Sequence, residues 1–229
     1  MWTRKELKDQ AKAGLKRNYW KSVIIGFLVS LITAGTAAST SHSAGSDTLT
    51  EVFTTMSAGE ILLALGVLFS AVVLTLFVSA LFRAMVYNPV KVGVANFFLD
   101  GVKDTAEWKS LAVGFAPKWF ANVWALFLRD LFVVLWSLLL VVPGVIKSYE
   151  YRLVEYVMAE NPGMAAMEAI AKSKALMQGN KWNAFVLDLS FLGWNILNAC
   201  TFGILGIFYV QPYQMLTNAA LYEKLKQNV

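Results

Sequence analysis

Long stretches without a charged residue dominate the pattern of this chain. Residues 61–82 contain no Asp, Glu, Lys or Arg over 22 positions, and residues 22–46 are uncharged with an apolar first half. A third uncharged stretch covers 34 positions, residues 189–222. A helix needs about 20 apolar residues to cross a hydrocarbon core of roughly 30 Å. The pattern therefore predicts an all-α, polytopic membrane protein; the competing interpretation is the buried core of a soluble protein.

Turn signals divide the chain into about six spans, arranged as three hairpins in a single integral-membrane domain over residues 1–229. The longest stretch would measure about 51 Å as one helix, at roughly 1.5 Å per residue, so we expect two spans joined by a turn near Thr201–Gly203. Proline disrupts a helix interior, so Asn88-Pro89 and Pro143-Gly144 are expected to end the second and third spans. The predicted spans cover residues 21–38, 60–87, 119–142, 145–160, 183–200 and 203–221.

Three further segments are expected outside the spans, on the cytoplasmic side. Thr3 and Glu6 fit a capping box, so residues 1–20 are expected to form a basic amphipathic helix. A basic helix of this kind would lie with its apolar face on the anionic inner leaflet. That face consists of Leu7, Ala11, Leu15 and Tyr19. Residues 88–118 are expected to form an interfacial segment and residues 161–179 a second surface helix.

Composition agrees with this prediction, and the distribution of charge predicts how the protein is oriented in the membrane. The chain is 57% hydrophobic and 15% charged, whereas a soluble domain carries about 25% charged residues. Lys and Arg mark cytoplasmic loops. They cluster before the first predicted span and are absent from residues 39–57, which contain Asp47 and Glu51. We therefore expect a multi-pass protein of the bacterial plasma membrane, with both termini in the cytoplasm and residues 39–59 outside.

Two alternatives bear on this topology. The net charge of +5 is interpreted as a topology signal and an attraction to anionic lipids of the inner leaflet, rather than as a sign of nucleic-acid binding. A cleaved signal peptide is the alternative for the N-terminus. The segment of about 20 residues before the first apolar run is long for the basic part of such a peptide, which favours a helix of its own.

Three tryptophans are expected to anchor the bundle at the cytoplasmic interface. Trp20, Trp119 and Trp182 each stand beside a lysine and open an odd-numbered span. Tryptophan favours the membrane–water interface, and a neighbouring lysine can reach the headgroups. Their positions support three helical hairpins that each begin on the inner side.

Charged residues inside the predicted spans are the candidate functional residues. A charge at the bilayer centre costs about 2.5–3.5 kcal/mol on insertion scales, so such groups face the bundle interior and find partners. On one continuous helix, Lys147 would pair with Glu150, and Arg152 with Glu155, because residues three positions apart lie on the same face. The whole predicted charge network contains Arg129, Asp130, Lys147, Glu150, Arg152, Glu155 and Asp188.

Three interpretations of these charges stay open. In the first, Lys147, Glu150, Tyr151 and Asp188 line a groove for a lipid headgroup, an ion or a polar solute, with the other charges as a supporting network. In the second, all the charges are paired and fix the register of the helices. In the third, residues 145–160 lie on the membrane surface, which leaves five or four spans.

The chain lacks the groups of residues that usually carry catalysis or hold a metal. It has one histidine, His42, and one cysteine, Cys200, and it contains no nucleophile elbow, P-loop or H-E-x-x-H motif. We therefore expect a protein that is not an enzyme and that uses no cofactor or metal. An intramembrane enzyme acting through a carboxylate such as Asp188 is the catalytic alternative.

Several blocks of the sequence resemble a bacterial family. The blocks are LKRNYWKS, NPVKVGVANFFL, LWSLLLVVPGVIKSYEY, EAIAKSKALMQGNKW, FVLDLSFLGWNIL, TFGILGIFYVQPY and ALYEKLK. Together, and nearly from end to end, they resemble the integral-membrane family called domain of unknown function nine-seven-five. The resemblance implies a multi-span plasma-membrane protein with no established activity. The order of the motifs is also similar to that in the membrane domain attached to some glycerophosphodiester phosphodiesterases.

Most of the singled-out positions fit the pattern of this family. Arg152 and Glu155 depart from it, since smaller or apolar residues are expected there. The positions that fit are Lys147, Tyr149, Tyr151, Lys181, Trp182, Asp188, Gly193 and Trp194.

The sequence thus predicts a non-enzymatic membrane protein that handles a lipid headgroup or a small polar solute in a polar groove between helices. The alternative is an accessory or scaffold protein that binds another membrane protein. A stripe of small or polar residues facing the lipid would distinguish the second hypothesis from the first.

Overall fold

The described part of the chain is helical throughout. The computed structural model describes residues 2–38 and 57–227, and no strand occurs among them, which confirms the all-α prediction. The predicted outer loop with His42, Asp47 and Glu51 lies outside the described residues. The elements are α1 (Arg4–Arg17), α2 (Tyr19–Ala38), α4 (Ala58–Phe82), η1 (Arg83–Tyr87), α5 (Asn88–Lys103), η2 (Trp108–Phe115), α6 (Trp119–Leu139), α7 (Val141–Glu150), α8 (Val154–Glu160), α9 (Ala166–Met177), α10 (Lys181–Leu189), α11 (Leu192–Cys200), η3 (Gly206–Val210) and α12 (Gln211–Lys226).

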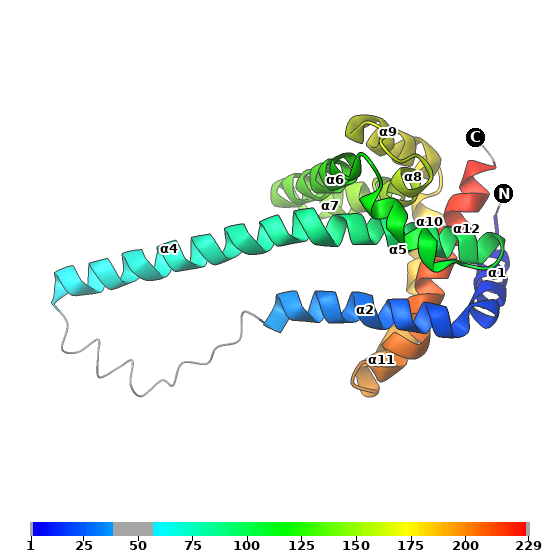
Figure 1. Ribbon diagram of the computed structural model, residues 1–229, viewed down its shortest axis with the longest axis horizontal. Helices are drawn as coiled ribbons and strands as arrows, with labels where there is room; N and C mark the ends of the chain where they lie inside the picture. Colours follow the sequence, from blue (N-terminus) through cyan, green and yellow to red (C-terminus); the bar gives the residue numbers. More distant parts are fainter. Residues whose placement is uncertain (1, 39–56, 228–229) are drawn as a thin grey trace.

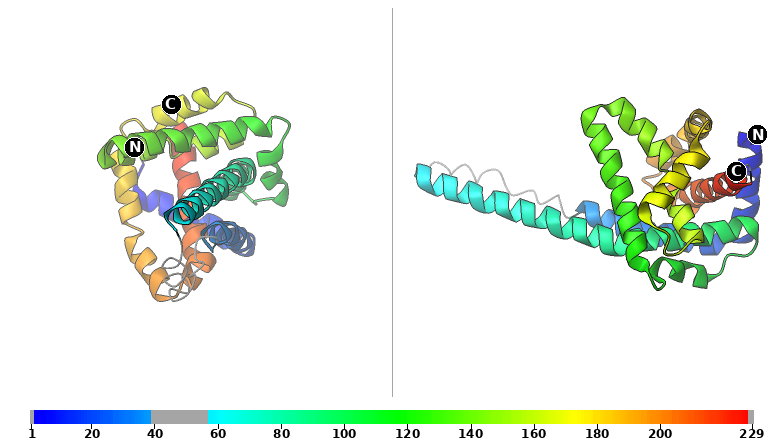
Figure 2. Two further views of the ribbon diagram at one scale, coloured as in Figure 1. Left: turned by 90° about the vertical axis from the view of Figure 1, so that its left-hand side faces the viewer. Right: turned by 90° about the horizontal axis from the view of Figure 1, so that it is seen from above.

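Helix α4 extends far beyond the rest of the molecule, while the other helices gather around α5 and α12 (Figure 1). Helix α2 points in the same direction as the projecting part of α4 but is shorter. The view from above in Figure 2 shows the same projection. Helix α1 and the end of α12 lie together at the opposite end, where Lys224 forms an ion pair of 2.6 Å with Glu6. The two ends of the described chain therefore lie on the same side of the molecule.

The apolar face of α1 packs inside the protein, which corrects the prediction that it lies on lipid. Leu7 and Ala11 are fully buried and Leu15 is 4% exposed, because α1 packs along α12 and α5. Thr3 caps the helix as predicted, since its hydroxyl accepts a hydrogen bond of 3.2 Å from the Glu6 amide. Only the basic side of α1 remains available to a membrane surface.

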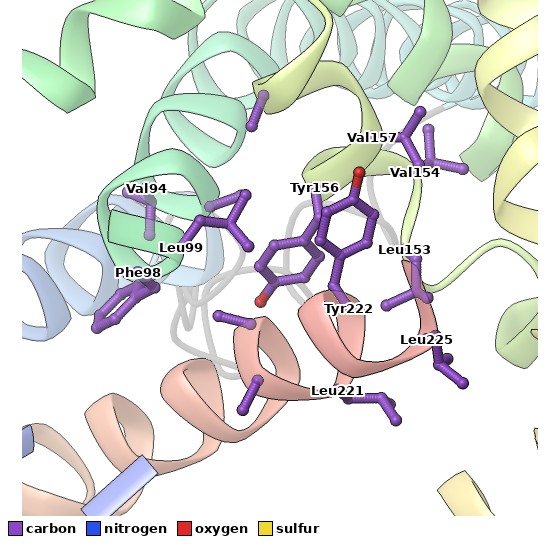
Figure 3. Close-up of a cluster of buried hydrophobic side chains, with 14 of the residues drawn as sticks. Val94, Phe98, Leu99, Leu153, Val154, Tyr156, Val157, Leu221, Tyr222 and Leu225 are labelled. Atoms are coloured by element: carbon purple, nitrogen blue, oxygen red, sulfur yellow. The ribbon is translucent and has the colours of Figure 1, made fainter. Parts of the chain in front are cut away.

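The densest part of the core lies between α5, α8 and α12. Tyr156 of α8 stacks on Tyr222 of α12 with 5.8 Å between the ring centroids, and both rings are almost fully buried. Figure 3 shows these two rings between Leu99 of α5 and the α12 helix. Two aromatic rings with this separation gain about 0.5–1.5 kcal/mol beyond their burial. The short helix α8 is therefore a core element.

Helices α4 and α5 form one continuous helix, so Asn88-Pro89 does not end the second span as predicted. The five residues before Asn88 form the π-helical turn η1. Proline has no amide hydrogen and clashes with the carbonyl four residues earlier, and a wider π turn provides the space. The same device occurs at η3, directly before Gln211-Pro212. Residues 88–103 are consequently a packed helix, and the location of residues 88–118 at a membrane interface stays a prediction.

The third and fourth predicted spans also differ from the structure. Helix α6 ends at Leu139, and the chain reverses at Leu140, whose backbone is extended; Pro143-Gly144 lies in the first turn of α7. Residues 145–160 do not form one helix. Helix α7 ends at Glu150, a turn covers residues 151–153, and α8 follows. This interruption rotates the side chains of α8 relative to those of α7.

The last third of the chain contains a helical hairpin. The predicted turn near Thr201–Gly203 is present, with left-handed backbone at Phe202 and Gly203, and Asn198 accepts a hydrogen bond of 2.5 Å from the Gly206 amide across it. The predicted span 183–200 is divided into α10 and α11 by a turn at Ser190-Phe191. Lys8 reinforces this turn, since its ammonium lies 4.6 Å from the centre of the Phe191 ring.

Two stretches of the described chain are long and apolar enough to cross a membrane. They are Gly59–Lys103 and Trp119–Leu139, and Tyr19–Ser30 is a shorter apolar helix. Length and composition alone define these stretches, so a membrane location has weak support from them. The number of spans, their hairpin arrangement and their orientation stay predictions.

Candidate functional site

Glu150 is the centre of the first predicted ion cluster. It lies at the end of α7 and is only 4% exposed. Its two carboxylate oxygens accept hydrogen bonds from Lys147 at 2.7 Å and from Lys181 at 2.5 Å. The Ser173 hydroxyl donates to the Glu150 carbonyl and accepts from the Leu153 amide. The predicted pair Lys147–Glu150 is therefore present, and Lys181 of α10 completes it.

Asp188 is the centre of a second cluster, which joins α7, α10 and α12. Arg152 donates to both of its carboxylate oxygens, at 2.6 and 2.7 Å. The Tyr149 hydroxyl donates at 2.8 Å to one of the same oxygens. Arg152 also donates to the Asn218 side chain at 2.6 Å. This two-pronged geometry is the strongest form of an arginine–carboxylate contact.

The third cluster contains Arg129, Asp130 and Glu155. Arg129 of α6 lies 2.8 Å from Asp130 and donates to Glu155 of α8 at 3.4 Å. The expected pair Arg152–Glu155 is therefore wrong. The turn at residues 151–153 breaks the helix, so these two side chains point to different partners. Tyr151 is buried at 7% exposure, with its ring 6.4 Å from that of Phe132.

The charges of the three clusters balance when all three are taken together. Arg129, Lys147, Arg152 and Lys181 face four acids, which are Asp130, Glu150, Glu155 and Asp188. Buried charges that are paired and hydrogen-bonded in this way hold helices in a fixed register. The four residues predicted to line a groove, Lys147, Glu150, Tyr151 and Asp188, thus contact protein groups. Their arrangement supports the structural interpretation of these charges.

Sequence reasoning missed three partners in these clusters. The sequence pattern predicts that Lys181 accompanies the interfacial Trp182, whereas its ammonium contacts Glu150. Tyr149 and Asn218 are uncharged, so the pattern of charged residues did not point to them. Both belong to the Asp188 cluster. The block VIKSYEY gave a usable hint for Tyr149, since that residue fits the family pattern.

A cavity of about 110 Å³ lies where α2, α5, α8 and α12 meet. We call it the α5–α8 cavity. Most of its wall is apolar and comes from Val29, Val90, Val94, Ala95, Phe98 and Met215. Four polar residues complete the wall, and they are Tyr87, Lys91, Glu155 and Tyr156. A base and an acid from different helices therefore line a small, mainly apolar space. The prediction placed Lys91 in an interfacial segment and did not connect it with Glu155.

The contacts of the polar groups in this cavity include one aromatic ring and two long hydrogen bonds. The Lys91 ammonium lies 4.5 Å from the centre of the Tyr87 ring. Glu155 uses one oxygen for its 3.4 Å contact with Arg129. The Tyr156 hydroxyl donates to the Met215 carbonyl at 3.4 Å. The two hydrogen bonds are longer than the usual 2.7–3.2 Å of hydrogen bonds in proteins.

A further ion cluster ties together the ends of α5, α8 and α12, which are Lys103, Glu160 and Lys226. Glu160 accepts hydrogen bonds from Tyr222, at 2.8 Å, and from Lys226, and Lys103 lies 3.8 Å away. Burial acts to raise the pKa of Glu160. The hydrogen bonds from Lys226 and Tyr222 and the nearby positive charges outweigh burial, so its pKa is lowered. This cluster holds the carboxylate in its charged form.

The three tryptophans stand at helix starts, as their positions in the sequence suggested. Trp20 and Trp182 are the second residues of α2 and α10 and are 70% and 72% exposed. Trp119 is the first residue of α6 and is half-buried. Their contact with a membrane interface stays a prediction. In the described part of the chain, no three His, Cys, Asp or Glu side chains lie close enough together to hold a metal ion.

The C-terminal part of the chain is similar to a known family. Residues 125–229 match the family described as "Protein of unknown function (DUF975)". The DUF975 match begins within α6 and covers Glu155 and the clusters of Glu150 and Asp188. Lys91 and α4 lie outside the DUF975 match. No curated protein matches the chain. No solved structure matches it.

Proposed function

We propose that this chain is a non-enzymatic, multi-pass membrane protein that holds a lipid headgroup or a small polar solute in the α5–α8 cavity. The observation that carries the proposal is the placement of Lys91 and Glu155 in the wall of one small apolar space. Such a site combines apolar walls with a few polar groups that orient a ligand. The predicted groove residues contact other groups of the protein, so the proposal moves the ligand to this cavity.

Helix α4 supports the membrane part of the proposal. Its uncharged stretch, residues 61–82, is about 33 Å long as a helix, which fits a hydrocarbon core of roughly 30 Å. Large apolar side chains such as Leu62 and Phe69 are more than 70% exposed. The Thr75 hydroxyl donates within the helix, to the Ala71 carbonyl at 2.8 Å. A helix with these properties is stable when lipid surrounds it.

The charge asymmetry described in the sequence supports the orientation. Under the rule that Lys and Arg favour the cytoplasmic side, this asymmetry favours both termini in the cytoplasm and the start of α4 outside. Helix α1 and the end of α12 lie on the same side of the molecule, in agreement with termini that share one side of a membrane. The basic face of α1 would then meet anionic lipids of the inner leaflet.

Filling the cavity tests the proposal. Val90→Phe adds bulk to the cavity wall, whereas Val72→Phe makes the same change on α4, where the side chain is 55% exposed. Both variants and the wild type are extracted gently and weighed intact by native mass spectrometry. We expect a retained lipid or solute in the wild type and in Val72→Phe, and its loss in Val90→Phe. A wild type without a retained ligand, or a Val90→Phe protein that keeps it, would overturn the proposal.

An accessory role is the second candidate, and a stripe of small residues on α4 favours it. Ala64, Ala71, Thr75 and Ser79 recur at seven- and four-residue intervals on one face, and the last three are exposed. Small residues let membrane helices approach closely. Under this hypothesis a membrane-protein partner co-purifies with the wild type and with Val72→Leu, but not with Ala71→Leu. Equal recovery with both variants would refute a role for this stripe.

A further inference from the structure

We propose that a second site, at the start of α6, binds an anionic phospholipid whose headgroup carries a hydroxyl group. Lys118, Asn122 and the first turn of α9 form this site. It shares no wall residue with the α5–α8 cavity. The inference uses the membrane location in the proposed function, but it does not depend on a ligand in the α5–α8 cavity.

Two adjoining spaces meet at Lys118. The inner cavity, of about 160 Å³, has Pro117, Asn122 and Pro162 in its wall. The outer groove, of about 840 Å³, lies between α6 and the first turn of α9, two helices that pack side by side (Figure 1). Lys118 and Gly163 belong to both walls. The stem of Lys118 lies across Gly163, since a Cβ on that glycine would be 2.5 Å from the Lys118 Cδ.

Asn122 presents a buried acceptor to this site. The residue is 1% exposed, and its Nδ2 donates to the Gly114 carbonyl at 3.0 Å. That contact identifies the nitrogen of the amide, because an oxygen in its place would face a second acceptor. The Asn122 Oδ1 accepts no hydrogen bond from the described part of the chain. Buried polar atoms nearly always have a partner, so we expect a hydroxyl or N–H donor in the inner cavity.

The start of α9 favours a negative charge beside Lys118. Its N-cap residue is Ala165, which offers no side-chain acceptor to the first amides of the helix. These amides lack partners inside a helix, and together with the helix dipole they attract phosphate groups. The acid of this first turn, Glu168, is exposed and belongs to neither wall. We therefore expect an anionic group between the Lys118 ammonium and α9.

The backbone of Lys118 agrees with a role for its side chain. Its φ is 119°, in the left-handed region that favours glycine. Strained positions of this kind persist where the surrounding structure holds them, and they gather at binding sites. Lysine thus occupies a position at which glycine would be less strained, and its ammonium is the group that glycine lacks.

The outer groove favours a phospholipid over a free phosphate ester. Its apolar side chains are Phe120, Trp124, Met164 and Met167, and all but Met164 are exposed. They would contact acyl chains, while the phosphate lies at Lys118 and a headgroup hydroxyl donates to the Asn122 Oδ1. Phosphatidylglycerol has all three parts, which are one negative phosphate, free hydroxyls and acyl chains.

The test uses delipidated full-length protein and three lipids with identical acyl chains. Each lipid is titrated separately, and native mass spectrometry measures the bound fraction. Phosphatidylmethanol has the charge of phosphatidylglycerol without its hydroxyls, and phosphatidylcholine has no net charge. We expect phosphatidylglycerol to bind about fivefold more tightly than phosphatidylmethanol, as one neutral hydrogen bond provides. We expect it to bind about tenfold more tightly than phosphatidylcholine, because the net charge of phosphatidylglycerol strengthens its contacts.

Four variants assign the binding to this site. Lys118→Met should weaken phosphatidylglycerol binding about tenfold, whereas the matched control Lys174→Met, an exposed position of α9, should bind like the wild type. Ala165→Asp should cap α9 and raise stability, yet weaken binding by repelling the phosphate, a combination that a purely structural role does not give. Asn122→Leu should remove the preference over phosphatidylmethanol and keep the preference over phosphatidylcholine. If Asn122→Leu does not fold, the wild-type comparison of these lipids tests the same acceptor.

Several results would overturn the inference. Equal binding of phosphatidylglycerol and phosphatidylmethanol to the wild type would mean that no headgroup hydroxyl reaches Asn122. Unchanged binding in both Lys118→Met and Ala165→Asp would place the lipid elsewhere, such as on the basic face of α1. Free glycerol phosphate that binds as tightly as the lipid would identify a soluble ligand instead. Val90→Phe separates the two sites: we expect it to leave phosphatidylglycerol binding unchanged, and loss of binding would place this lipid in the α5–α8 cavity and support the proposed function alone.

Discussion

Asp188→Asn tests whether the internal charges hold the fold together. The substitution keeps the shape of the side chain and removes its charge. Arg152 would lose its two-pronged partner, at 2.6 and 2.7 Å, and would keep only Asn218. Tyr149 would lose the charged acceptor of its hydroxyl. The variant therefore leaves a mostly buried guanidinium without a compensating charge.

The expected magnitude follows from the burial of the two side chains. The Arg152 side chain is 18% exposed and the Asp188 side chain 39% exposed. Removing one partner of a fully buried pair costs about 3–5 kcal/mol, whereas exposed pairs contribute about 0.2–1 kcal/mol. Because solvent screens the acid but not the base, we expect a loss of about 2 kcal/mol in the free energy of unfolding.

The assay is unfolding of the purified protein in mixed micelles by increasing SDS, followed by circular dichroism. Asp130→Asn is the matched control, because Asp130 is 53% exposed and pairs with an arginine of its own helix; it should cost about 0.5 kcal/mol. A double-mutant cycle with Arg152→Gln isolates the pair, and we expect a coupling of about 1–2 kcal/mol, in the range for residues in direct contact.

A refutation would take a specific form. If Asp188→Asn is no more harmful than Asp130→Asn and its coupling to Arg152 is within error of zero, the cluster does not stabilise the fold. If Asp188→Asn instead leaves stability unchanged and removes a bound ligand, the groove hypothesis with Lys147, Glu150, Tyr151 and Asp188 would be correct after all.

Two further predictions concern acid stability and close packing. The pKa of Glu160 in the folded protein is lowered from its ordinary value of 4.5. Its contribution to stability is therefore full above pH 4.5 and is lost as the pH falls through the lower pKa of the folded state. Glu160→Gln should flatten the acid side of a plot of stability against pH, and an unchanged acid side would contradict this. A Cβ at Gly93 would meet a backbone carbonyl of η2 at 2.2 Å, whereas one at Gly193 would meet nothing within 4 Å. Gly93→Ala should therefore lower the free energy of unfolding by about 1–3 kcal/mol, and Gly193→Ala should raise it by about 0.5–1 kcal/mol. The same SDS unfolding measures both, and equal effects of the two substitutions would refute the close approach at Gly93.

Local signals in the sequence predicted several features correctly. The all-α class, the cap of Thr3, the turn at Thr201–Gly203 and the pair Lys147–Glu150 depend on residues a few positions apart. Patterns of this kind are set by helix periodicity and by the special backbone of turns. The family match over residues 125–229 agrees with the resemblance of the sequence blocks in that range, while the blocks LKRNYWKS and NPVKVGVANFFL lie outside the match.

The remaining features depend on distant contacts. Arg152 pairs with a residue 36 positions away because the chain turns after α7, and the local pattern carried no stop signal there. Proline at position 89 predicted a helix end, but the packing of α5 in the core allows a π turn instead. Lys91 and Glu155 line one cavity only because α5 and α8 meet in the folded protein. Pattern analysis alone therefore could not locate this site.

The central claim is that α4 crosses a membrane, with its start outside and α1 in the cytoplasm. Single cysteines at Gly59 and Lys12, in a Cys200→Ser background, test it directly, since Lys12 is exposed and a side chain at Gly59 meets nothing within 4 Å. Intact cells are treated with a membrane-impermeant maleimide before and after permeabilisation. The account predicts labelling of Gly59→Cys in intact cells and of Lys12→Cys only after permeabilisation. Labelling of both sites, or of neither, in intact cells would contradict it.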